Sequence, residues 1–218
     1  MSLERDLAAV NASIAEKMPL ETRQKISSAN TQFQASFDPK TTIQNGDTFP
    51  AFRLRDALGQ EVSRDELLIQ GPLLITFYRG GWCPYCNLAL RSLHLNMGKF
   101  LEKGVQLVAI SPEVPDASLS TTEKHDLKFT VLSDAGNQLA NDLGILFVQD
   151  DKLRPIYQSF GFDLKKHNGD DSFAVPIPAT FLLDKSGVVK NSFIDPDYTK
   201  RLDPTTALKW IDDLNNQA

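Results

Sequence analysis

The sequence predicts an α/β fold with a mixed central sheet flanked by helices and a helical extension at the N-terminus. Two apolar runs rich in β-forming residues, 73–78 and 105–110, are separated by a segment with apolar residues at helical spacing. Strands joined by a helix are expected to be parallel with a right-handed crossover. Near the C-terminus, 180–183 and 188–194 flank the turn 184–187 and form an antiparallel hairpin. A sheet with both arrangements is mixed.

Residues 1–40 are expected to form a helical arm ahead of a domain that occupies residues 41–218. Apolar residues recur at helical spacing on both sides of Pro19: Leu3, Leu7, Val10, Ile14 and Met18 before it, and Ile26, Phe33 and Phe37 after it. Two placements of these helices are open. They cover the core of their own chain, or they pack on a second subunit of a homodimer.

The domain elements then follow in order along the chain. A hairpin is expected from 52–54 and 61–62 around the turn 57–60, followed by the strand 73–78, a helix to about 102 and the strand 105–110. Next come a helix at about 116–127, a strand at 130–132, a helix near 136–143, a helix over 153–164 that begins with Pro155 in its first turn, and a polar loop at 167–172. After the hairpin, Asp203 caps a final helix that begins with Pro204.

The only two cysteines stand three residues apart, in Trp82-Cys83-Pro84-Tyr85-Cys86, where the helix begins. Unpaired N–H groups and the dipole at a helix N-terminus favour negative charge, so we expect the pKa of Cys83 to be lowered. Pro84 suits the first helical turn. Cys86 lies one turn further along, close enough to attack a sulfur or a sulfenic acid on Cys83. The spacing therefore predicts a redox-active pair with Cys83 as the nucleophile.

Two other uses of a cysteine pair fit less well. A structural disulfide needs an oxidising compartment, and a loop this short would constrain the unfolded chain little. A zinc site needs four ligands, and His94, His125 and His167 are scattered without ligand spacing. We therefore expect no metal and no cofactor.

The residues of the turn before the cysteines are expected to help Cys83 react in three ways. Gly80 and Gly81 allow unusual backbone angles and the close approach of a substrate. Trp82 would form an apolar wall of the site. Arg79 is a cation beside Cys83 that would stabilise a thiolate, and the alternative is an arginine that points into solvent.

The predicted topology brings two distant residues to the same sheet edge. The carboxyl ends of strands 73–78 and 105–110 share that edge, so Glu113 should lie near Cys83. There Glu113 either moves protons for the thiols or is a solvated loop carboxylate. A strand from 179 that runs antiparallel would start at this edge, and Pro178 before it is expected to be cis and to leave an open backbone edge beside Trp82.

The composition of the chain argues against some classes of binding partner. The chain has 218 residues, of which 41% are hydrophobic and 23% are charged, as in an ordinary globular protein. A net charge of −5 argues against nucleic acid or an anionic membrane as a partner. No apolar stretch approaches the length of a membrane span, and the N-terminus lacks the apolar region of a secretory signal. A cytoplasmic location is therefore expected, where such a cysteine pair would be catalytic.

With these motifs the chain resembles the peroxiredoxin-like branch of the alkyl hydroperoxide reductase C / thiol-specific antioxidant group. The resemblance covers about Asn45 to Ile194 and rests on Gly46-Asp47-x-x-Pro50-x-Phe52-x-Leu54, on Phe77 to Cys86, on Val131-Leu132-Ser133-Asp134 and on Pro178 to Asp184. It implies a thioredoxin-like fold and reduction of a peroxide by Cys83, which becomes a sulfenic acid. It further implies that Cys86 resolves this acid as a disulfide, and that thioredoxin or glutathione then reduces the disulfide.

Two positions depart from the pattern of this group. Peroxiredoxins typically have Thr or Ser where this chain has Gly80, and Arg where it has Pro178. Pro178 instead resembles the proline beside the disulfide of thioredoxins, and Cys-Pro-Tyr-Cys is the glutaredoxin form of the motif. A peroxidase is thus the first interpretation and a thiol-disulfide oxidoreductase the second. A redox sensor without turnover and a cysteine hydrolase are more distant alternatives.

Overall fold

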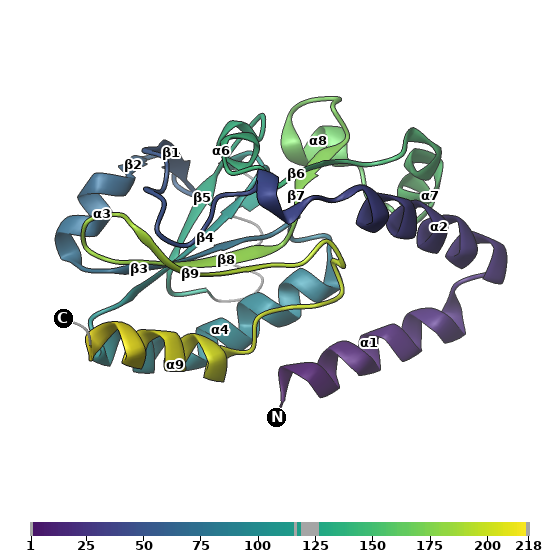
Figure 1. The fold of residues 1–218 in the computed structure, drawn as a ribbon. Coiled ribbons are helices and arrows are strands. Elements are labelled where there is room, and N and C mark those ends of the chain that lie inside the picture. Colours follow the sequence, from purple (N-terminus) through teal and green to yellow (C-terminus); the bar gives the residue numbers. More distant parts are fainter. Residues whose placement is uncertain (1, 116, 119–126, 217–218) are drawn as a thin grey trace.

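The computed structural model describes residues 2–115, 117–118 and 127–216, and its centre is a seven-stranded sheet (Figure 1). The strands of this sheet are β1 Arg53–Asp56, β2 Glu61–Ser63, β3 Leu73–Phe77, β4 Gln106–Ser111, β5 Thr130–Ser133, β8 Ala179–Leu183 and β9 Val189–Ile194. They lie side by side in the order β2-β1-β5-β4-β3-β8-β9. A separate two-stranded sheet pairs β6 Leu146–Val148 with β7 Ala174–Pro176.

Helices cover both faces of the main sheet. They are α1 Leu3–Lys17, α2 Leu20–Ser36, α3 Arg64–Gln70, α4 Pro84–Glu102, α6 Gln138–Asp142, α7 Arg154–Ser159, α8 Leu164–Asn168 and α9 Pro204–Asn215, with short 3-10 turns at η1 Pro39–Thr41 and η2 Asp151–Leu153. In Figure 1, α4 and α9 lie together on one side of the sheet. There Phe100 of α4 and Ile211 of α9 pack with Leu182 of β8.

The sheet is mixed, as the sequence predicts. β3 runs parallel to β4 and antiparallel to β8, with Phe77 opposite both Ile110 and Ala179. The ends of β3 and β4 therefore meet the beginning of β8 at one edge. This edge brings the segment from Arg79 to Cys83 close to the segment that follows Ser111.

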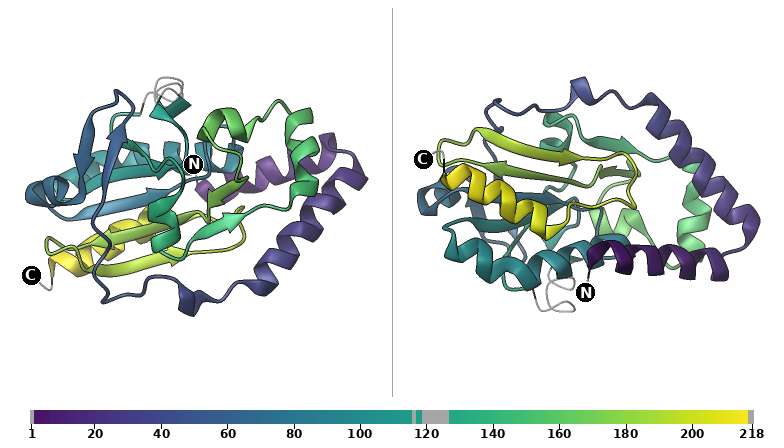
Figure 2. Two further views of the ribbon diagram at one scale, coloured as in Figure 1. Left: turned by 90° about the horizontal axis from the view of Figure 1, so that it is seen from above. Right: turned by 60° about the horizontal axis from the view of Figure 1, so that its bottom comes forward.

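The two N-terminal helices lie against different parts of their own chain. Leu3 and Leu7 of α1 are buried in a cluster with Cys83, Cys86 and other residues of α4. Helix α2 carries Phe33, whose ring stacks on Phe147 of β6 with 3.9 Å between centroids. Figure 2 shows the two helices joined at the far end of the molecule, with α1 beside α4 and α2 beside α7. The arm thus packs on its own chain at the end of the sheet where the cysteines lie.

Three local expectations differ from the structure. The helix expected over 153–164 is divided into the end of η2, α7 and the start of α8, and Gly161, which has a left-handed backbone conformation with φ 81°, ends the helical path between α7 and α8. His167, expected in a loop, lies in the last turn of α8. The strands β6 and β7 were not expected, and the helix expected at 116–127 falls mostly outside the described residues.

The hairpins and the final helix agree with expectation. β1 pairs with β2, and β8 pairs with β9, both antiparallel. Asp203 accepts a hydrogen bond from the backbone N–H of Thr205 at the start of α9. None of the helices described here is long and apolar enough to cross a membrane.

Candidate active site

The two cysteines lie where β3 passes into α4, and both are reduced. Cys83 is the N-cap residue of α4 and Pro84 is its first residue, as expected. Only 1% of Cys83 and 0% of Cys86 is exposed. The Cys83 side chain accepts no hydrogen bond from the first-turn amides of α4. The helix N-terminus therefore orients Cys83 but gives its sulfur no direct N–H donor.

The expectation of a lowered pKa at Cys83 is wrong: within the pair, the pKa of Cys86 is lowered and that of Cys83 is raised. Burial would raise the pKa of Cys86, but a hydrogen bond from the Cys83 thiol and the charges of Arg201 and Arg79 offset it and lower the pKa to about 5. Arg201 Nη2 donates to the Cys86 sulfur at 3.3 Å. Burial, followed by the hydrogen bond to Cys86 and the nearby negative charge, raises the pKa of Cys83 well above its usual value. These directions favour a thiolate on Cys86 and a thiol on Cys83.

Arg79 is buried, and the solvent-facing alternative is wrong. Only 2% of the residue is exposed, and Nη2 donates to Gln149 Oε1 at 2.9 Å and to the Tyr157 hydroxyl at 2.8 Å. The guanidinium lies 4.9 Å from the ring centroid of Trp82 and 4.3 Å from that of Tyr198. Burial would lower the pKa of Arg79, but Tyr157 and Cys83 raise it, so the charge is kept.

The backbone of Gly80 explains why this chain has no threonine there. Gly80 has φ +142°, a conformation that other residues rarely adopt. A Cβ on Gly80 would lie 2.3 Å from Trp82 Nε1, so the indole of Trp82 fills the space where a side chain would stand. Trp82 itself contacts Tyr157 and Phe162, with ring centroids at 5.5 and 5.7 Å. It forms the expected apolar wall.

We expect Gly80→Ala to destabilise the fold by about 1–3 kcal/mol, through the strained backbone and the contact with Trp82. Gly98→Ala is the matched control, because its Cβ would meet open space within α4 and alanine favours a helix. Urea unfolding of both variants measures the difference. Equal stability of the two variants would contradict this explanation of the missing threonine.

Glu113 is a buried carboxylate that holds the turn before the cysteines. It is 1% exposed, so the solvated alternative is wrong. Its Oε2 accepts the backbone N–H of Gly81 at 3.0 Å, and its Oε1 lies 3.3 Å from His167 Nδ1. Glu113 lies near Cys83 as expected, but these contacts are to the turn and to α8 and not to a sulfur. Its supported role is to position Gly81.

Pro178 does not form the groove that the sequence suggested. The Ile177–Pro178 peptide is trans, which contradicts the expected cis bond. β8 begins at Ala179 and pairs with both β3 and β9, and the N–H of Ile177 donates to Ile145 at 2.7 Å. The backbone beside Pro178 therefore has no open edge for an extended peptide. Pro178 instead lines a separate small cavity with Cys86 and Arg201.

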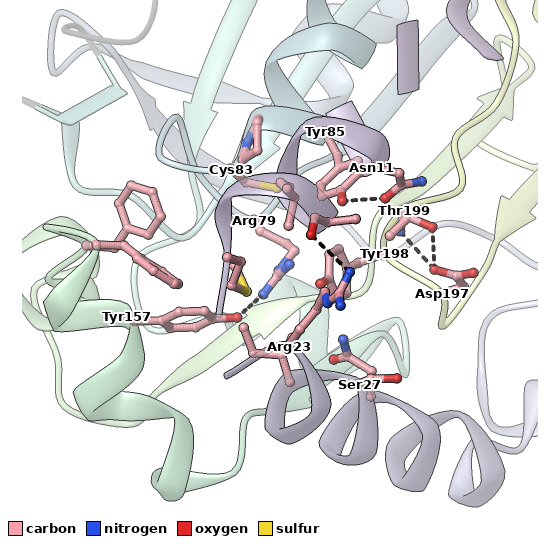
Figure 3. Close-up of a pocket in the computed structure, with 18 of the residues that line it drawn as sticks. Asn11, Arg23, Ser27, Arg79, Cys83, Tyr85, Tyr157, Asp197, Tyr198 and Thr199 are labelled. Carbon is pink, nitrogen blue, oxygen red and sulfur yellow. Dashed lines mark hydrogen bonds between the residues drawn. The ribbon is translucent and has the colours of Figure 1, made fainter. Parts of the chain in front are cut away.

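A large cavity of about 680 Å³ opens on Cys83, and the N-terminal helices form much of its wall (Figure 3). Its lining includes Asn11, Ile14, Met18, Arg23 and Ile26 from the arm, Arg79, Trp82, Cys83, Pro84 and Tyr85 from the cysteine segment, and Tyr157, Phe160, Phe162, Asp197, Tyr198 and Thr199 from further along the chain. The Tyr85 hydroxyl donates to Asn11 Oδ1 at 2.6 Å and so ties α4 to α1. Cys86 does not line this cavity.

Several residues of the site escaped sequence reasoning. Arg201 lies 115 positions from Cys86, and Tyr157 and Gln149 lie more than 65 positions from Arg79. They stand in no motif with the cysteines, so only the folded chain reveals them. In the part of the chain that the structure describes, no three His, Cys, Asp or Glu side chains gather to hold a metal ion.

Residues 45–192, more than half of the chain, match the model of the AhpC/TSA family. The chain belongs to the AhpC/TSA family. It is therefore a thiol-dependent oxidoreductase, a thiol peroxidase or a disulfide oxidoreductase. The arm and the segment that carries Tyr198 and Arg201 lie outside the matched region.

Curated relatives include both kinds of enzyme. The chain is 27% identical to a chloroplastic peroxiredoxin Q of Suaeda salsa over 79% of this chain and 69% of that protein. It is 23% identical to the thiol-disulfide oxidoreductase ResA of Bacillus cereus over 73% of this chain and 75% of that protein. Among solved structures, the peroxidoxin BcpB of Mycobacterium tuberculosis matches with a TM-score of 0.62 at 20% identity, over 79% of this chain and 98% of that one. This similarity confirms the thioredoxin-like, peroxiredoxin-type fold.

Proposed function

We propose that this AhpC/TSA protein reduces hydroperoxides, with Cys83 as the attacking sulfur and Cys86 as the resolving one. The observation that carries the proposal is that Cys83 borders the large cavity beside Arg79, whereas Cys86 lies outside that cavity. A substrate that enters the cavity reaches Cys83 first. Cys86 carries the negative charge and activates Cys83 by taking its proton.

The first step begins with the proton of the Cys83 thiol. Cys83 passes this proton to the Cys86 thiolate, which its lowered pKa leaves deprotonated at neutral pH. The Cys83 thiolate then attacks the terminal oxygen of the hydroperoxide, and the O–O bond breaks. The leaving alkoxide takes the proton from Cys86 and departs as an alcohol. Cys83 is now a sulfenic acid and Cys86 a thiolate again.

The second step closes the disulfide. The Cys86 thiolate attacks the sulfur of the Cys83 sulfenic acid, and the hydroxyl leaves as water after it takes one proton from solvent. Cys83 and Cys86 lie in the same buried cluster, so the resolving cysteine is near the attacking one before oxidation. A dithiol such as thioredoxin, or two glutathione molecules, then reduces the disulfide and returns both thiols.

Arg79 is proposed to hold the hydroperoxide. Its Nε–H is buried and has no hydrogen-bond partner among the described residues, so the fold leaves this donor unused. The guanidinium borders the cavity next to Cys83 and carries a full charge. It is suited to stabilise the negative charge that develops on the leaving oxygen.

We expect Arg79→Met to slow the reaction of the reduced protein with peroxide by about 10²–10³-fold, as the loss of one charge-stabilising donor does elsewhere. The same change should raise the pKa of both thiols, because the positive charge favours either thiolate. Arg79→Lys keeps the charge and should be affected less. Stopped-flow oxidation and a thiolate titration measure the two effects, and unchanged values in Arg79→Met would rule out this role.

A disulfide oxidoreductase is the second candidate. The short Cys-Pro-Tyr-Cys segment, with both cysteines in one buried cluster, suits thiol-disulfide exchange, and ResA is among the relatives. A redox sensor would oxidise once without turnover. Stopped-flow oxidation by hydrogen peroxide, an organic hydroperoxide and oxidised glutathione, followed by turnover with thioredoxin, separates these functions. Oxidation by glutathione disulfide faster than by either peroxide would replace the peroxidase proposal.

We also propose that residues 1–40 act as an arm that closes the active site of the same chain, since α1 and α2 wall the cavity. The thioredoxin or glutathione partner, the redox-active disulfide and the cytoplasmic location remain predictions, as does a homodimer.

A further inference from the structure

One cation of the arm points into the active-site cavity and has no carboxylate partner among the residues that the structure describes. Arg23 extends from α2 into the space between Tyr157 and Tyr198 in Figure 3. Among the described residues no acidic group lies within 4 Å of it, and its Nη1 donates to the backbone oxygen of Ala15 at 3.0 Å. A guanidinium has five N–H donors, so most of its capacity is free for a ligand.

The walls around Arg23 are largely apolar. The side chains that form them are Ile14 of α1, Met18 directly after it, Ile26 of α2, Trp82 beside Cys83, and Phe160 and Phe162 after α7. A cavity of about 680 Å³ is far larger than hydrogen peroxide needs and falls within the range of sites for whole organic molecules. Its size and lining favour a substrate with an apolar body.

Several other polar groups of this cavity have partners within the protein. Asn11 accepts the Tyr85 hydroxyl, and Asn30 is hydrogen-bonded to Tyr198. Asp197, a negative charge in the lining, accepts hydrogen bonds from the backbone N–H and the hydroxyl of Thr199 at 3.0 and 2.7 Å. Lys200 Nζ lies 3.9 Å from Asp197 and balances its charge. Arg23 is thus the charged group of the arm that the fold leaves for a ligand.

We propose that the cavity selects organic hydroperoxides that carry a negative charge, with the apolar body against Trp82 and the arm and the anionic group on Arg23. The proposal rests on the proposed function, in which the hydroperoxide becomes an alcohol and water while the two cysteines become a disulfide. Arg23 is then a specificity-determining residue that the family match does not contain. The arm supplies the selectivity, and the cysteine segment supplies the chemistry.

Arg23 also has a structural role that the test must separate. Its bond to Ala15 satisfies a carbonyl in the last turn of α1 and joins the two arm helices. Arg23→Gln keeps an N–H donor for that carbonyl and removes the charge. Lys25→Gln is the matched control, because Lys25 lies on the same helix, pairs with Glu21 at 2.8 Å and does not line the cavity.

The experiment uses two inert product alcohols so that binding is measured apart from chemistry. Calorimetry compares 2-phenylpropan-2-ol with its para-carboxylate on the reduced full-length protein. The wild type should bind the carboxylate about tenfold more tightly, as expected for hydrogen bonds to a charged group in a partly enclosed site. Arg23→Gln should lose this preference, and Lys25→Gln should keep it. Turnover of the two matching hydroperoxides is measured in parallel.

Each result of this experiment either supports or overturns the inference. No preference for the carboxylate in the wild type, or a preference that survives in Arg23→Gln, overturns the inference. A preference lost in both variants also overturns it, since net charge and not Arg23 would then be the cause. A preference lost only in Arg23→Gln supports it. If that pattern appears while neither hydroperoxide is reduced, the anion site stands and the proposed peroxidase function fails.

Discussion

Replacement of Cys83 by serine should lower turnover of hydroperoxide by at least about a thousandfold, the scale found when a catalytic nucleophile is removed. Cys83 is the sulfur that borders the cavity, and serine at this position has no thiolate to attack a peroxide. Cys86 keeps Arg201 beside its sulfur in this variant, but it lies outside the large cavity, in a separate small one with Pro178. A coupled assay with thioredoxin measures the loss.

Cys86→Ser is the partner variant and should behave differently. It should oxidise once at Cys83 and then stop, because the sulfenic acid has no resolving thiol. The single oxidation should be slower than in the wild type at neutral pH, since the Cys86 thiolate that accepts the Cys83 proton is gone. Sustained turnover in Cys86→Ser with thioredoxin would show that a disulfide between these two cysteines is not part of the cycle.

The second large effect concerns Arg201, which donates to the Cys86 sulfur at 3.3 Å. In the wild type the pKa of Cys86 is lowered to about 5, after burial is offset by the Cys83 hydrogen bond and by Arg201 and Arg79. The thiolate is therefore present above about pH 5 and is lost as the pH falls through that value. Oxidation by peroxide should follow the same curve.

Arg201→Met removes one of the charges that favour the thiolate, so the pKa of Cys86 must rise. We expect the midpoint of the pH–rate curve to move upward by about 1–2 units, the range typical of a lost neighbouring charge. The variant should then be slowest relative to wild type between pH 5 and 7, by about 10–100-fold. Absorbance of the thiolate and stopped-flow rates across this range measure the shift.

Arg91→Met is the control, because Arg91 is exposed on the same helix as Cys86. It removes an equal charge without a contact to the sulfur, and its curve should match the wild type. If Arg91→Met and Arg201→Met move the midpoint equally, general surface charge and not the Arg201 contact sets the pKa.

The elements that sequence reasoning found are those with a local signal. The strands β3 and β4 are continuous apolar runs, and α4 has regular apolar spacing, so their parallel pairing could be derived. The strands β6 and β7 have three residues each and pair across a long stretch of chain, which leaves no local pattern. The break near Gly161 was missed because the apolar spacing continues through it.

In the candidate site, too, the sequence predicted the features that have a local signal and missed those that depend on distant parts of the chain. The positions of Cys83 and Pro84 at the start of α4 follow from the motif and the preceding strand. The distribution of charge between the two thiols does not follow from the motif. It depends on Arg201, which comes after β9 in the chain and lies against the Cys86 sulfur in the fold. The cis expectation at Pro178 failed because a motif likeness cannot show that β8 is paired on both edges.

The central claim is that Cys83 attacks the substrate although Cys86 carries the negative charge. The most direct measurement is the rate of sulfenic acid formation in the two single variants, trapped with dimedone and located by peptide mass spectrometry after one equivalent of organic hydroperoxide. Cys86→Ser should be labelled rapidly at Cys83, and Cys83→Ser should be labelled at Cys86 at least about a hundredfold more slowly, because Cys86 lies outside the cavity that the hydroperoxide enters. Faster labelling of Cys86 in Cys83→Ser would contradict the claim and make Cys86 the peroxide-reactive sulfur.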